Sequence, residues 1–196
     1  MNFNLELCLN NHLSSVYNVQ DTKFHQTLFY RGENGIHTQI LEFFNSGINE
    51  NERCVYLTTQ SDGNVIFESL KENNNSSSTI KLFSYFNLPD PVISPTSFGE
   101  KMEKIKNIIL NPGFQGRVAF NVLGDMSRFS LKVISEITEI ENFLESLSGQ
   151  NIKLFCTFKI GIENESSLQM MKMAMSTHDH AIFENEDGSF SQVILK

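Results

Sequence analysis

Gly32 and Gly35 form a turn between a short apolar run, Thr27–Tyr30, and an amphipathic segment. The free backbone N–H groups at a helix N-terminus favour anions, so a glycine turn at this place could bind phosphate. A working nucleotide loop reads G-x-x-x-x-G-K-[ST]. The segment Gly32–Thr38 reads GENGIHT, which is one residue short, lacks the second required glycine and has His37 in place of the lysine. The turn has the position of a nucleotide loop without its chemistry.

Asp125 and Ser127 follow a second apolar run, Arg117–Leu123. In nucleotide-hydrolysing folds an aspartate at the end of such a strand holds magnesium. Open α/β sheets also bind ligands at the carboxyl ends of their strands. The alternative is that Asp125 or Ser127 caps the helix that follows. Because the loop lysine is missing, capping is the favoured interpretation.

Histidines and cysteines are the remaining residues that could do chemistry. His178 and His180 would lie on one face of a strand, which a metal can use. No cysteine or glutamate beside them completes a site, so we expect no metal. Cys156 could act as a nucleophile with His25 or His178 as its base. Its apolar neighbours favour a core strand instead, and we expect no catalytic residue.

Apolar periodicity predicts the elements that position these residues. Five strands are expected at Thr27–Tyr30, Cys54–Thr58, Thr79–Phe83, Arg117–Leu123 and Ile152–Phe158. Helices are expected over an apolar stripe from Ile36 to Ile48 and at Asn64–Lys71, Ser97–Leu110, Ser130–Leu147 and Ser166–Ser176. Glu141 lies in mid-helix and is interpreted as an exposed charge. Residues 73–78 are expected to form a polar loop, and the prolines of residues 87–95 exclude regular structure there.

The alternation of strands and helices predicts an α/β three-layer sandwich with a mostly parallel sheet. A β-hairpin around Asp187-Gly188, with strands at Ala181–Glu184 and Phe190–Leu195, closes the chain. We expect residues 1–196 to form a single domain. Residues 1–24 are expected to be an N-terminal arm or an added edge strand.

The composition narrows the classes of function. The chain has 196 residues and a net charge of −8, which argues against nucleic acid as a partner. It contains no apolar stretch long enough to span a membrane and does not begin like a secretion signal. Its three cysteines are an odd number without C-x-x-C spacing, which favours a reducing, cytoplasmic location.

An ordered set of residues suggests a family. The set consists of His25, Tyr30, Phe44, Gly47, Glu52, Cys54, Gly116, Arg117, Gly124, Glu141, Cys156, Thr157 and His178. It spans about residues 24–190 and resembles the MEDS domain, the methanogen/methylotroph DcmR-type sensory domain. Ile140 and Phe190 depart from it, since they stand where that family has tyrosine and tryptophan.

The resemblance implies a fold similar to RecA/KaiC ATPases with a degenerate phosphate loop. It also implies a non-catalytic domain that senses a small molecule in signal transduction or transcriptional regulation, without a cofactor. The signal would pass to a protein partner such as a kinase or regulator, and a second copy of the chain is a further candidate partner. The expected ligand-binding residues are His25, Tyr30, Gly32, Gly35, His37, Asp125, Ser127 and His178.

Two alternatives remain open. The first is a RecA-like ATP-binding protein or ATPase that uses Gly32, Gly35, Thr38 and Asp125. The second is a regulatory subunit that docks on a kinase or ATPase through its sheet edge or through its Met-rich helix at Ser166–Ser176.

Overall fold

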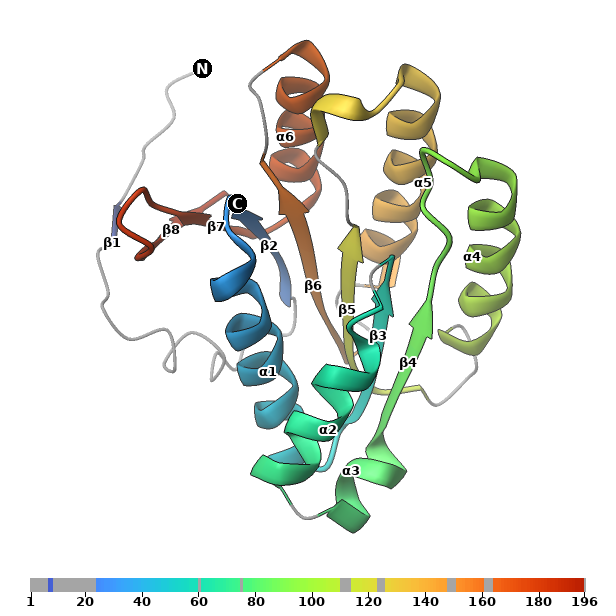
Figure 1. Cartoon of the computed structure of the whole chain (residues 1–196), viewed down its shortest axis with the longest axis vertical. Coiled ribbons are helices and arrows are strands. Elements are labelled where there is room, and N and C mark those ends of the chain that lie inside the picture. Colours follow the sequence, from blue (N-terminus) through green and yellow to red (C-terminus); the bar gives the residue numbers. More distant parts are fainter. Residues whose placement is uncertain are drawn as a thin grey trace.

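The computed structural model describes residues 7–8, 24–59, 61–74, 76–109, 114–122, 126–147, 151–160 and 164–195. A central sheet lies between two layers of helices (Figure 1). One layer contains α1 (Glu33–Asn49), α2 (Gly63–Asn73) and α3 (Ser76–Leu82). The other contains α4 (Pro95–Ile109), α5 (Leu131–Leu147) and α6 (Glu165–Thr177), and a short 3-10 helix, η2 (Met126–Arg128), precedes α5.

The sheet has eight strands in the order β1-β8-β7-β2-β6-β5-β3-β4. Their bounds are β1 Leu7–Cys8, β2 Phe24–Tyr30, β3 Arg53–Thr58, β4 Phe83–Asn87, β5 Gly116–Val122, β6 Ile152–Lys159, β7 His180–Glu184 and β8 Phe190–Ile194. The six strands from β7 to β4 in that order are parallel, and β8 runs antiparallel to both β7 and β1. The predicted three-layer α/β fold, its mostly parallel sheet and its C-terminal hairpin are confirmed. Of the predicted N-terminal arm or edge strand, the structure describes the two-residue strand β1 and Phe24, and residues 1–6 and 9–23 lie outside the described residues.

The prediction for residues 73–83 is wrong. Ser76–Leu82, which the local pattern divides between a polar loop and a strand, is the helix α3, and the strand begins only at Phe83. Thr79 is buried and donates a hydrogen bond to the carbonyl of Leu70 in α2. Pairing with β3 from Cys54↔Phe83 to Thr58↔Asn87 then fixes the strand further along the chain. Tertiary pairing and packing against α2 therefore override the local apolar pattern.

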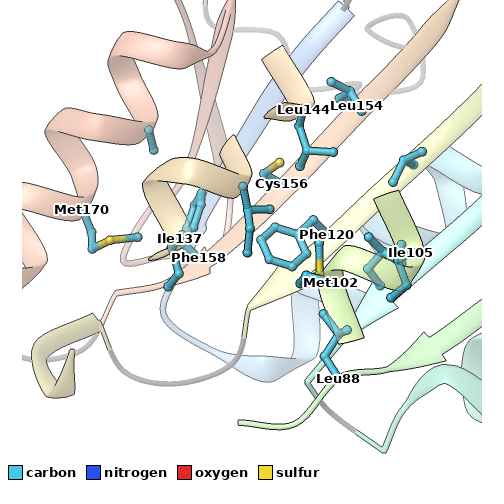
Figure 2. Packing of buried hydrophobic residues seen from close by; sticks show 14 of the residues in the cluster. Leu88, Met102, Ile105, Phe120, Ile137, Leu144, Leu154, Cys156, Phe158 and Met170 are labelled. Atoms are coloured by element: carbon cyan, nitrogen blue, oxygen red, sulfur yellow. The ribbon is translucent and has the colours of Figure 1, made fainter. Parts of the chain in front are cut away.

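Each face of the sheet has its own apolar core. The cluster under α1 and α2 includes Tyr30, Phe43, Phe44 and Tyr56. The larger cluster under α4, α5 and α6 includes Phe120, Cys156 and Phe158, and Figure 2 shows them packed against Ile137, Leu144 and Met102. No described helix of the chain is both long and apolar enough to cross a membrane.

Candidate functional site

The glycine turn lies at the carboxyl end of β2, where α1 begins after its N-cap residue, Gly32. The backbone N–H groups of Arg31 and Gly32 both donate to one carboxylate oxygen of Glu184, at 2.5 and 2.9 Å. Glu184 is the last residue of β7, the strand beside β2. An acidic side chain of the chain itself is therefore bound at the edge of the turn where a nucleotide loop would hold phosphate.

Phe190 of β8 closes the turn from the same side. A Cβ atom built on Gly35 would lie 2.8 Å from Cζ of the Phe190 ring, closer than such atoms approach one another. Gly35 leaves room for the hairpin ring, which would have to shift for any larger residue. The glycine that suggested a phosphate loop thus has a structural role in this molecule.

His37 is held by a polar network below the turn. Its Nε2 lies 3.3 Å from Asp62, which also accepts hydrogen bonds from the hydroxyls of Tyr56 and Thr58 at 2.7 and 2.8 Å. Burial and the charge of Asp62 raise the pKa of Tyr56 well above its ordinary value, so Tyr56 remains a hydrogen-bond donor. Sequence reasoning missed Asp62, because a single aspartate in a turn carries no motif.

The network continues across the sheet. Asn121 of β5 donates to the Tyr56 hydroxyl at 2.9 Å and accepts from Thr157 of β6 at 2.7 Å. Asn121, Thr157 and Thr58 are fully buried. Buried polar groups of this kind are stable when they are hydrogen-bonded to one another, so the network fixes the neighbouring strands β3, β5 and β6.

A pocket of about 390 Å³ lies beside the turn, at the carboxyl ends of β2, β6 and β7. Its apolar wall includes Ile160, Leu168, Met171 and Phe183, and its polar lining includes Arg31 and Glu184. The carboxyl-edge cavity that the fold leads one to expect is present. It lies on the α6 side, however, and none of residues 32–37 lines it.

The eight predicted ligand residues do not form one site. Tyr30, Gly32, Gly35 and His37 lie at or beside the turn, with Tyr30 fully buried at the end of β2. Asp125 and the side chain of Ser127 lie outside the described residues. His25 and His178 belong to a separate cluster. His25 lies near the amino end of β2, and His178 follows the last residue of α6.

That second cluster brings together His25, Glu141, Cys156 and His178. One possible ligand atom from each residue lies within 4.8 Å of the others, and all four side chains are buried. Glu141 Oε2 lies 3.6 Å from His25 Nε2 and 3.5 Å from His178 Nε2. Cys156 Sγ lies 3.5 Å from His25 Nε2. Two imidazoles, a carboxylate and a thiol therefore face one point.

Contacts at Nδ1 orient both imidazole rings, those of His25 and His178. His25 Nδ1 lies 2.9 Å from a Glu145 carboxylate oxygen, and His178 Nδ1 lies 2.6 Å from the carbonyl oxygen of Ala174. Burial alone would lower the pKa of His25, but the carboxylates of Glu141 and Glu145 outweigh it and raise that pKa above its ordinary value. Burial raises the pKa of Cys156 well above that of a free thiol, which argues against a metal-free nucleophile.

Two sequence interpretations are corrected here. Glu141 is fully buried, not exposed, because it lies on the apolar stripe of α5 between Ile137 and Leu144. Its spacing of i+4 from Ile137 and i−3 from Leu144 was the signal that could have revealed this. His178 packs on His25, with ring centroids 3.8 Å apart, whereas its expected partner His180 is absent from the described cluster.

Several residues of the set that resembles the MEDS domain have a structural role in this fold. Arg117 is fully buried, and its guanidinium donates to Glu52, to Ser46 and to the carbonyl of Phe43. A Cβ atom on Gly47 would lie 2.7 Å from Arg117 Cδ. Gly47 and Glu52 thus accommodate one buried arginine.

Comparisons with known proteins identify the class of fold. No family model matches the chain, so the resemblance to the MEDS domain is not confirmed, and no curated protein matches it. Among solved structures it is similar to the RadB recombinase, with a TM-score of 0.60 and 11% identity over 82% of this chain and 74% of that chain. It is also similar to a solved ATPase domain, with a TM-score of 0.54 and 12% identity over 85% of this chain and 70% of that chain. The chain has a RecA-like fold.

Proposed function

We propose that this chain is a RecA-like regulatory domain that senses a small ligand and does not hydrolyse ATP. The observation that carries the proposal is the Glu184 carboxylate bound to the backbone N–H groups at the start of α1. A triphosphate at this turn would have to displace a negative charge. It would also lack the lysine that stabilises the β- and γ-phosphates, since His37 lies against Asp62.

The pocket beside the closed turn supports ligand sensing. Its volume of about 390 Å³ lies within the range of small-molecule sites. Leu168 and Met171 contribute apolar surface from α6, and methionine adapts readily to ligands of different shape. The chemistry of this lining fits a small, largely apolar molecule with one polar group near Arg31 or Glu184. Such a ligand would act on a protein partner such as a kinase or regulator.

An ATP-binding RecA-like protein is the second candidate. The two structural neighbours favour it over a sensory domain, because they are a recombinase and an ATPase domain. The backbone N–H groups at the start of α1 also remain suited to an anion once Glu184 moves away.

Calorimetric titration with ATP and magnesium separates the two candidates. We expect no magnesium-dependent binding by the unmodified chain. Glu184→Gln removes the negative charge and keeps a hydrogen-bond acceptor, so it should gain weak binding of phosphate or ATP. Glu72→Gln changes the same charge at an exposed position of α2 that does not line the pocket and should behave like the unmodified chain. Micromolar binding of magnesium-ATP by the unmodified chain would instead establish the second candidate.

A thermal-shift screen with small organic molecules tests the sensory role. A ligand at a hundred times its Kd should stabilise the chain by about 2.7 kcal/mol. Met171→Trp fills the pocket and should abolish the shift. Met175→Trp makes the same change at an exposed position of α6 outside the pocket lining and should preserve it. A shift that persists in Met171→Trp would place the ligand elsewhere.

A further inference from the structure

We propose that His25, Glu141, Cys156 and His178 bind one Zn²⁺ ion in a buried structural centre. The four residues come from β2, α5, β6 and the C-cap of α6. Imidazole nitrogen, thiolate sulfur and carboxylate oxygen are the ligands that zinc takes in proteins. This centre lies away from the turn and its pocket, and it does not depend on the function proposed for them.

The distances fit a tetrahedral site. Bonds of about 2.1 Å around a tetrahedral ion separate neighbouring ligand atoms by about 3.4 Å. The two Glu141–histidine separations are 3.6 and 3.5 Å, and the separation between Cys156 Sγ and His25 Nε2 is 3.5 Å. Three of the six separations thus match the edges of one coordination tetrahedron, and all six are within 4.8 Å.

The outer contacts match those of a metal site. A histidine that binds a metal through one nitrogen usually donates the other N–H to a carboxylate or a backbone carbonyl. His25 has the carboxylate of Glu145 at its Nδ1, and His178 has the carbonyl of Ala174. These contacts direct both Nε2 atoms toward Glu141 and leave them in position to bind the ion.

The charge balance favours a cation at this place. Glu141 is fully buried, and neither of its carboxylate oxygens has a hydrogen-bond partner among the described residues. A buried carboxylate without such partners is costly. One Zn²⁺ ion balances the charge of Glu141 together with that of a Cys156 thiolate. The carbonyl end of α6, which His178 caps, also favours a positive charge.

Four buried protein ligands make this a closed site, which is typical of structural zinc. The ion would connect the strands β2 and β6 to α5 and to the end of α6. The expectation of no metal rested on the neighbouring pair of His178 and His180, which has no further ligand beside it in the sequence. The ligands of this site are instead separated by up to 153 positions in the chain, from His25 to His178.

Metal titration of chelator-treated protein tests the proposal. We expect one Zn²⁺ per chain by elemental analysis. Co²⁺ should give the visible bands of tetrahedral coordination together with a thiolate charge-transfer band. The double variant Cys8→Ser/Cys54→Ser keeps Cys156 as its one thiol and leaves all four ligands intact, so it should retain that band. Folded wild-type protein that binds no stoichiometric metal, or a band lost in this double variant, would overturn the proposal.

Variants of the ligands and of their neighbours locate the site. Cys156→Ser should lose the charge-transfer band, and Glu141→Gln should lower zinc affinity. His180→Ala is the matched control for histidine loss and should bind normally. Glu145→Gln should weaken zinc binding by about 10- to 100-fold while the cobalt spectrum keeps its shape, because Glu145 only positions His25. Unchanged stoichiometry and spectrum in Cys156→Ser would assign the metal to another place.

Discussion

Arg117 shows how one residue can look functional in a sequence and be structural in the fold. In the sequence, Arg117 belongs to the set that resembles the MEDS domain. Here the guanidinium lies 2.5 Å from Glu52 and 3.0 Å from Glu50, and it also lies over the ring of Phe43. These contacts tie β5 to the end of α1 and to the segment that leads into β3.

Replacing Arg117 should therefore affect stability. Arg117→Met leaves Lys153 as a cation beside Glu50 and Glu52, but it removes the donors to Ser46 and to the buried carbonyl of Phe43 and should lower the free energy of unfolding by about 1–3 kcal/mol. Arg117→Lys keeps the charge but loses the planar fork of donors. Its free energy of unfolding should therefore lie between those of the unmodified chain and Arg117→Met. Arg128→Met, at an exposed position, should change stability by less than about 0.5 kcal/mol. Urea unfolding measures all three, and an Arg117→Met value near that of the control would refute the structural role.

Glu141 and Cys156 show how far the environment of a single residue could be predicted from the sequence. The apolar neighbours of Cys156 correctly predicted a core strand. Glu141 was misplaced because a charged residue on a helix is usually solvated, and only its position on the stripe of α5 indicated burial. Residues that meet only in three dimensions, such as Glu184 at the turn, leave no local signal in the sequence.

At the scale of elements, the C-terminal hairpin determines what the turn can do. β7 supplies Glu184 to the N–H groups of the turn, and β8 supplies Phe190 to Gly35. The hairpin itself was predictable from the Asp187-Gly188 turn signal and its flanking apolar runs. Its contact with the turn was not, because it joins residues about 150 positions apart.

A double-mutant cycle tests this contact. Gly35→Ala should destabilise the chain by about 1 kcal/mol, because the overlap of its methyl group with the Phe190 ring outweighs the helix stabilisation that alanine gives. In a Phe190→Ala background the overlap is absent, so the same change should stabilise the chain. Gly99→Ala, in α4 with open space around it, should instead stabilise by about 0.5–1 kcal/mol. Urea unfolding of the four cycle members would give no coupling if the ring did not close the turn.

At the scale of the whole molecule, the alternation of apolar runs was sufficient to predict three layers and a parallel sheet. The order of the strands was not predictable from it. That order places β2 and β6 in the centre, with a polar turn at one end of β2 and a histidine cluster at the other. The predicted start of β4 was wrong for a related reason, because pairing with β3 determines where β4 begins. Local pattern thus defines the elements, and long-range pairing defines the sites.

The same architecture predicts an uneven distribution of stability. Every residue of β2 is buried, and nearly all of β6 is, whereas the residues of β8 are half-buried or exposed. Amide hydrogens of β2 and β6 should therefore exchange only through global unfolding, and those of β8 through local opening. Because β8 carries Phe190, its opening would also release the turn.

Hydrogen exchange followed by mass spectrometry can test this link. Peptides from β8 should exchange well before those from β2, β5 and β6. Phe190→Ala should speed exchange at both β8 and the start of α1, since the ring packs on Gly35. Val65→Ala, at an exposed apolar position of α2, should leave both regions unchanged. If β8 were protected as strongly as β2, the turn would be closed permanently, and the α1 N-terminus could take no part in ligand binding.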